Sequence, residues 1–128
     1  MNNKPLALII EDHEDQNLIF TEAMFQAGYK TESIMDGDIA KKRLEEVVPA
    51  MVILDLNLPG TQGRSLLSQI RNDERMEDVT VILATADSRQ ADELRSQSDI
   101  VLLKPISFPQ LSILATRFKN YMKSNKNF

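Results

Sequence analysis

The stretch MVILDLNLPG, residues Met51–Gly60, places four apolar residues directly before an acid and then ends in residues that break regular structure. An apolar run this short, stopped by Asn57, Pro59 and Gly60, is typical of a strand buried on both faces of a parallel sheet. Ligands of such sheets bind outside the carboxyl ends of the strands, which is where Asp55 would lie. A single Asp can simply end a strand, so the role of Asp55 depends on what ends the other strands.

The length and composition favour a single domain, taken as residues 1–128 with a frayed polar tail over 124–128. Without cysteine, the chain forms no disulfide and no thiolate metal site. The 15 Lys and Arg against 19 Asp and Glu give a net charge of -4, which argues against direct nucleic-acid binding, since phosphate contacts need clustered cations. No apolar run approaches the roughly 20 residues that span a bilayer. We therefore expect no membrane insertion and a cytoplasmic location.

Four further segments have the length and composition of strands, namely residues 6–10, 30–34, 79–84 and 100–103. Segments with helical spacing separate them, so the chain consists of five strand–helix units without a linker, a repeat or a low-complexity run. Such alternation predicts an α/β fold in which helices cover both faces of a parallel sheet and the crossovers are right-handed. A fold of this kind fixes no function by itself.

The helices between the strands are predicted from apolar residues at helical spacing and from start and stop signals. Asp15 is placed as the N-cap of the first helix and Gly28 as its C-terminal stop. Residues 36–38 are expected to form a turn, and Pro49 to end the second helix. Helices over 63–72 and 88–97 are separated by a polar connection over 73–78. The predicted apolar faces are Ile19, Phe20, Ala23, Met24 and Ala27; Ala40, Leu44, Val47 and Val48; Leu66, Leu67 and Ile70; Ala91 and Leu94; and Leu111, Leu114, Ala115, Phe118 and Met122.

Chemically useful side chains stand at the ends of four predicted strands, namely Glu11-Asp12, Asp55, Thr85 and Lys104. In a parallel sheet these ends share one edge. Three carboxylates there would raise one another's pKa unless a cation were present, and carboxylate oxygens favour a hard divalent ion such as Mg²⁺. A lysine and a hydroxyl suit the oxygens of a transferred phosphoryl group. The set predicts phosphoryl transfer to Asp55, with the carboxylate as covalent acceptor.

With these motifs in this order, residues Leu6 to about Met122 resemble the receiver domain of two-component response regulators. The resemblance rests on Glu11-Asp12, on Asp55 within ILDLNLPG, on Thr85-Ala86 and on Lys104-Pro105. It implies a flavodoxin-like (βα)5 domain with a parallel sheet in the order 2-1-3-4-5. It also implies a signalling switch that assists its own phosphorylation and dephosphorylation rather than a conventional enzyme.

The resemblance implies a role for each residue of the acidic site. Asp55 resembles the phosphoacceptor, and Asp12 and Asp55 resemble the carboxylate ligands of Mg²⁺. Glu11 would act on the metal mostly through water, and Asn57 through its backbone carbonyl. The implied partners are a sensor histidine kinase or a phosphotransfer protein and a downstream protein target whose identity the sequence does not give. Members of the family also form phosphorylation-dependent dimers.

Thr85 resembles the switch hydroxyl, and Lys104 the ion-pair partner of the phosphoryl group, with a cis bond between Lys104 and Pro105. The chain departs from the family at Val101, where many receivers carry the Tyr or Phe that responds to the hydroxyl. Valine has one stiff χ1 and cannot act as a long lever. We therefore expect a signal to leave through residues 85–88 and the segment after them.

Three other polar residues near the strand ends carry expectations. Asn57 and Asp87 stand two positions after the phosphoacceptor and the switch hydroxyl, where the family's hydrolytic water passes. Their small polar side chains predict a short-lived phosphoryl group. His13, which follows the acidic pair, is expected to be a solvated loop residue rather than a metal ligand or a base.

Two other functions fit parts of the pattern. Phosphatases of the haloacid dehalogenase type also use Asp, Thr or Ser, and Lys at strand ends, but they need a second Asp two positions after the nucleophile, where this chain has Asn57. They are also usually longer. A pseudo-receiver, an interaction module that does not need phosphate, would not require the acidic residues, Thr85 and Lys104 that are all present here.

Overall fold

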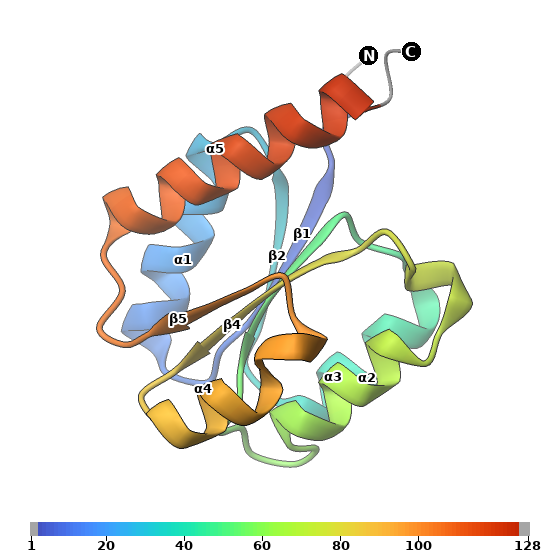
Figure 1. The fold of residues 1–128 in the computed structure, drawn as a ribbon, viewed down its shortest axis with the longest axis vertical. Helices are drawn as coiled ribbons and strands as arrows, with labels where there is room; N and C mark the ends of the chain where they lie inside the picture. The colour runs from blue at the N-terminus through green and yellow to red at the C-terminus, as the bar shows by residue number, and fades with distance from the viewer. Residues whose placement is uncertain (1–2, 126–128) are drawn as a thin grey trace.

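The computed structural model describes residues 3–125 and the side chains of residues 3–120, and within them it shows one parallel sheet between two layers of helices (Figure 1). The strand order is β2-β1-β3-β4-β5, which confirms the predicted order 2-1-3-4-5. The strands are β1 Leu6–Ile10, β2 Lys30–Ile34, β3 Met51–Asp55, β4 Thr80–Thr85 and β5 Ile100–Leu103.

Strand β4 lies one residue later than predicted, whereas the other strands have the predicted bounds. The Val79 amide donates to the Met76 carbonyl at 3.1 Å, within the preceding connection, and so takes no part in the sheet. At the other end, Thr85 pairs with Leu103 of β5. Thr85 is therefore held by the sheet itself rather than by a loop.

The helices cover both faces of the sheet, as predicted: α1 Glu14–Gln26, α2 Gly37–Glu46, α3 Gly63–Arg71, α4 Ser88–Leu94 and α5 Phe108–Asn125. Helices α1 and α5 pack on the face that carries Ile9 and Ile53, and α2, α3 and α4 pack on the face that carries Leu8 and Leu54 (Figure 1). Alternate residues of β1 and β3 thus enter opposite cores, which explains why these strands are apolar throughout. Among the described residues, no helix has both the length and the apolar character needed to cross a membrane.

The start of α1 differs from the prediction. Its N-cap is His13, whose Nδ1 accepts a main-chain amide of the first turn at 3.5 Å, and Asp15 instead lies inside that turn, where a negative charge favours the helix dipole. Ile19, predicted on the apolar face, is 42% exposed. Asn17 is buried in its place, because this turn of the helix lies over backbone carbonyls at the ends of β1 and β2. Gly28 ends the helix region as predicted, with a φ of 100°.

Helix α2 begins inside the predicted turn over 36–38. The Asp36 carboxylate caps it by accepting the amides of Asp38 and Ile39, at 2.7 and 3.1 Å, so the acid starts a helix rather than a turn. Gly37 is needed there because a Cβ would lie 1.8 Å from the carbonyl oxygen of Thr61. The loop between β3 and α3 therefore rests directly on the backbone of α2.

The end of α2 comes earlier than Pro49, which was predicted to stop it. The helix ends at Glu46 and Val47 is already extended, two residues before the proline. Val48 is 48% exposed and so does not belong to the apolar face, whereas Ala40 and Leu44 are buried as predicted.

The later helices follow the predicted faces. Helix α4 stops at Leu94, and a 3-10 turn over Arg95–Gln97 completes the predicted segment, while the polar connection over 73–78 contains another, Glu74–Met76. Helix α5 includes residues 124 and 125, which were expected to fray, and residues 126–128 and the side chain of Met122 lie outside the described part. The buried members of the predicted faces are Leu66, Leu67, Ile70, Ala91, Leu94, Leu111 and Ala115, and Leu114 and Phe118 are half-buried.

Candidate functional site

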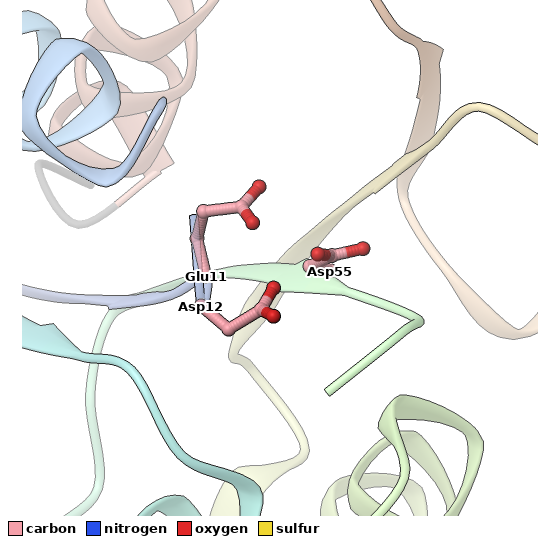
Figure 2. A group of neighbouring side chains, drawn as sticks. All are labelled: Glu11, Asp12 and Asp55. Atoms are coloured by element: carbon pink, nitrogen blue, oxygen red, sulfur yellow. The ribbon is translucent and has the colours of Figure 1, made fainter. Parts of the chain in front are cut away.

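The acidic residues predicted at the strand ends lie together. Glu11 and Asp12 follow β1, and Asp55 ends the neighbouring strand β3, with the carboxylates of Glu11 and Asp12 both pointing toward the side of Asp55 (Figure 2). Oxygens of all three lie within 4.8 Å of one another. Glu11 is 1% exposed and Asp55 4% exposed, while Asp12 faces solvent. Glu11 and Asp55 are therefore shielded from solvent, and solvent reaches the cluster at Asp12.

The environment of Asp55 makes its negative charge unfavourable. Burial raises the pKa of this carboxyl, and both the hydrogen bond to Glu11 and the charge of Glu11 raise it further. The amide of Asn57, which donates to Asp55 Oδ1 at 3.2 Å, and the charge of Lys104 act in the opposite direction on the pKa. The balance leaves the pKa above its usual range, so the site gains from an added cation.

Lys104 supplies the positive charge of the site. Its Nζ donates to Glu11 Oε1 at 2.7 Å and lies 3.4 Å from Asp55 Oδ2. The lysine is therefore bound more closely to Glu11 than to Asp55, a preference that the sequence did not indicate. The bond between Lys104 and Pro105 is cis, as the resemblance implied.

Thr85 lies at the same edge, one residue beyond the partner of Asp55 on β4, and is fully buried. Its carbonyl accepts the Lys104 amide at 2.8 Å, which joins β4 to the lysine. Its Oγ1 accepts the amide of Asp87 at 3.1 Å, and the Asp87 carboxylate caps α4 by accepting the amides of Arg89 and Gln90. The hydroxyl is thus connected to the start of α4 through one residue.

The remaining predicted residues lie around the cluster. His13 is exposed and caps α1. Among the described residues, the group of side chains close enough to share a metal ion consists of Glu11, Asp12 and Asp55 and does not include His13. The side chain of Asn57 is exposed, and its main-chain amide contacts the site by donating to Asp55.

Asn17 was missed by the sequence reasoning. Its side-chain amide is buried and donates to the carbonyl of Glu11 at 2.8 Å. The available signal was its position: Asn17 lies three residues before Phe20 and seven before Met24, on the face of α1 that enters the core. A polar residue at such a position must find hydrogen-bond partners in the interior.

The donor set suits a hard divalent cation. Three carboxylates share the site with one lysine, so the positive charge of Lys104 offsets only part of their negative charge. Oxygen ligands of this kind, with an open side for water, fit Mg²⁺. These residues could therefore hold a metal ion.

The sheet order and the acidic edge define an α/β protein of the flavodoxin-like class. Comparison with family models identifies the family within this class. Residues 7–115 match the model described as the response regulator receiver domain. The chain therefore belongs to the receiver domain family of two-component response regulators.

Curated relatives agree with the family. The chain is 30% identical over 110 residues to the phosphate regulon transcriptional regulatory protein PhoB of Rhizobium meliloti, covering 84% of this chain and 48% of that protein. It is 32% identical over 127 residues to the probable methanogenesis regulatory protein FilR2 of Methanothrix harundinacea, covering 91% and 82%. The chain thus spans about half the length of the first relative and most of the second.

Solved structures show the same fold. A receiver domain from Methylobacillus flagellatus described as CheY-like superposes with a TM-score of 0.78 at 25% identity, covering 91% of this chain and 99% of that one. The receiver domain of a sensor histidine kinase from Pseudomonas aeruginosa, with a magnesium ion coordinated in its active-site cleft, superposes with a TM-score of 0.79 at 24% identity, covering 91% and 98%.

Proposed function

We propose that this chain, over residues 1–128, is a receiver domain that works as a phosphorylation switch, accepting a phosphoryl group on Asp55 with the help of Mg²⁺. The observation that carries this proposal is a buried carboxylate with a raised pKa beside Lys104 and two further acids. The test is an intact-mass measurement after incubation with a small phosphodonor and Mg²⁺. The expected result is a mass increase of one phosphoryl group, and an unchanged mass would favour the pseudo-receiver.

In the proposed reaction, an oxygen of Asp55 forms a bond to phosphorus while the bond from phosphorus to the donor atom breaks. The donor leaves with the electron pair of that bond. Lys104 Nζ, 3.4 Å from Asp55, is close enough to bind an oxygen of the transferred group. Bound Mg²⁺ would supply positive charge for the phosphoryl oxygens.

Asp12 and Asp55 are the proposed direct metal ligands, with the Asn57 carbonyl as a third protein ligand. Both oxygens of Glu11 already accept hydrogen bonds, Oε1 from Lys104 and Oε2 from the His13 amide at 3.1 Å. This supports a role for Glu11 through water rather than by direct contact. The magnesium ion in the related receiver domain from Pseudomonas aeruginosa supports the choice of metal.

The switch is proposed to receive its phosphoryl group from a sensor histidine kinase or a phosphotransfer protein and to act on a downstream protein, with a phosphorylation-dependent dimer as one form of output. The chain spans about half of the transcriptional regulator from Rhizobium meliloti that it matches and most of the regulatory protein from Methanothrix harundinacea. Such a switch would work in the cytoplasm.

The phosphoryl group is expected to be short-lived, because Asn57 and Asp87 leave the path of the hydrolytic water polar and both are exposed. Replacing both with Leu should slow dephosphorylation severalfold, measured as the decay of the phosphorylated mass after donor removal. Asp87→Asn is the control, because Asn can still cap α4. An unchanged decay rate in the double variant would mean that water access is limited elsewhere.

The signal is expected to travel from Thr85 to α4 without an aromatic switch. Val101 is half-buried against the core that includes Leu94 of α4, so it has no large side chain to turn. If the Thr85 hydroxyl turns toward a phosphoryl oxygen, it releases the Asp87 amide and disturbs the cap of α4. Loss of a cap costs about 1 kcal/mol, which corresponds to roughly a fivefold change in local opening.

Hydrogen exchange with and without a phosphoryl mimic at Asp55 tests this route. We expect exchange over residues 87–97 to change by about fivefold in the native protein, and much less in Thr85→Val, which keeps the size of the side chain but loses the hydroxyl. Changes limited to the strand edge at Asp12, Asp55 and Lys104 would show that no signal reaches α4, and would favour the pseudo-receiver.

A further inference from the structure

The buried side-chain amide of Asn17 donates hydrogen bonds to several backbone carbonyl groups beside the acidic pair. Asn17, which is 3% exposed, donates through Nδ2 to the carbonyl of Glu11 at 2.8 Å and to those of Ile9 and Ile34 at 3.4 Å. These carbonyls come from the ends of β1 and β2. An amide NH2 has two hydrogens, so the short bond to Glu11 takes one of them and the two longer contacts share the other.

The oxygen of the same amide is held from the other side. Asn17 Oδ1 accepts the hydroxyl of Thr21 at 3.0 Å and the hydroxyl of Ser33 on β2. A turned amide would place its oxygen against the three backbone carbonyls, with no hydrogen available between them. The hydroxyls and carbonyls together therefore fix the orientation of the amide.

The bond to Glu11 acts on the peptide group that joins Glu11 to Asp12. The preceding peptide is fixed as well, because the Glu11 amide donates to the Ile34 carbonyl at 3.0 Å. Both peptide groups around the Glu11 Cα are thus restrained. With the backbone held in this way, the Glu11 side chain points inward to Lys104 and the Asp12 side chain faces solvent.

We propose that Asn17 is a positioning residue for the phosphorylation site, which sets the directions of Glu11 and Asp12 through the peptide between them. This inference rests on the proposed function, since it concerns the acids that would hold Mg²⁺. The simpler reading is that Asn17 only satisfies buried carbonyls and stabilises the fold. The two readings differ in whether the loss of Asn17 changes metal affinity or stability alone.

The test compares Mg²⁺ affinity, measured by calorimetric titration, in Asn17→Ala and in Tyr29→Phe. Tyr29→Phe is the matched control because it removes another buried hydrogen bond, from the Tyr29 hydroxyl to the Ala115 carbonyl at 3.1 Å, away from the acidic pair. Asn17→Ala should weaken Mg²⁺ binding by about 10- to 100-fold, as is typical when a group that orients a ligand is removed. Tyr29→Phe should leave it within about twofold, since it leaves the ligands in place.

Ser33→Ala provides a milder variant in case Asn17→Ala does not fold. It keeps the amide and removes one of the hydroxyls that orient it, so it should weaken Mg²⁺ binding by about threefold, the effect of one modest hydrogen bond. The proposal would be overturned if Asn17→Ala lowered stability but bound Mg²⁺ as tightly as Tyr29→Phe does. If only Ser33→Ala folds, the same comparison is made with that variant.

A metal-free measurement separates this inference from the proposed function. The His13 amide is bonded to Glu11 Oε2, so its exchange with solvent reports on the direction of the Glu11 side chain. Asn17→Ala, or Ser33→Ala in its place, should speed this exchange relative to Tyr29→Phe. If the native protein bound no Mg²⁺, the proposed function would fail, while faster His13 exchange would still support the positioning role and unchanged exchange would contradict it.

Discussion

Asp55→Asn is expected to abolish phosphoryl transfer completely while keeping the fold. An amide at this position has nearly the same shape but is no nucleophile toward phosphorus, so the mass increase with a small phosphodonor and Mg²⁺ should disappear. Asp12 faces solvent and Glu11 is bound to Lys104 and the His13 amide, so neither is expected to replace Asp55. Full labelling of the variant at another residue would show that Asp55 is not the acceptor.

The same variant should unfold at a higher denaturant concentration than the native protein at neutral pH. Burial raises the pKa of Asp55 above its ordinary value of 3.8, so ionisation of this group opposes folding. Below that ordinary value, Asp55 is protonated in both the folded and the unfolded chain and has no effect. As the pH rises through the raised folded pKa, its contribution becomes destabilising. The advantage of Asp55→Asn should therefore vanish toward acidic pH and grow as the pH rises above that ordinary value.

Denaturant midpoints measured across the pH range check this linkage. Saturating Mg²⁺ should reverse the order, because an ion that binds only the folded native protein stabilises it, whereas the variant lacks one of the carboxylates. If Asp55→Asn were less stable than the native protein at neutral pH without metal, the pair with Lys104 would outweigh the burial of the charge.

The sequence predicted the strands and the edge of the sheet well because both follow from simple patterns. An apolar run such as residues 51–54 is typical of a strand buried on both faces, and parallel strands bring their carboxyl ends together. These two patterns predict the cluster of Glu11, Asp12 and Asp55.

The helix starts are less predictable, because an acid serves equally well in a turn, as a cap or in the first turn of a helix. Asp36, predicted in a turn, caps α2, while Asp15, predicted as a cap, lies inside α1. The apolar periodicity also failed at Ile19, since the first turn of α1 covers polar backbone rather than apolar side chains. The partners of Asn17 were not predictable for the same reason: its side-chain NH2 donates to backbone carbonyls, which have no sequence signature.

The sequence also could not predict which acid Lys104 contacts most closely. Glu11 and Asp55 stand at the ends of adjacent strands, and only the packed structure shows that the lysine donates to Glu11 at 2.7 Å and lies 3.4 Å from Asp55. Sequence order could place these groups at one edge but could not rank their distances.

Asp12→Ala is expected to cause a larger loss of Mg²⁺ binding than any other single change next to the phosphoacceptor. Asp12 is the exposed acid of the cluster, and its carboxylate has no hydrogen-bond partner among the described residues, so it is free to bind an ion that keeps several waters. Its removal leaves Glu11 engaged by Lys104. We expect the affinity to fall by more than about 100-fold, because removing a direct ligand should cost more than removing a group that only orients one, and phosphorylation to slow with it.

His13→Ala is the matched control, since His13 is the next residue along the chain. Its side chain caps α1 through a long 3.5 Å contact, and its link to the cluster is a main-chain amide that the substitution keeps. It should therefore lower stability by about 1 kcal/mol or less and leave Mg²⁺ affinity almost unchanged. Titration of both variants with Mg²⁺ measures the difference. A greater loss of affinity in His13→Ala than in Asp12→Ala would mean that the histidine, and not the exposed aspartate, holds the metal.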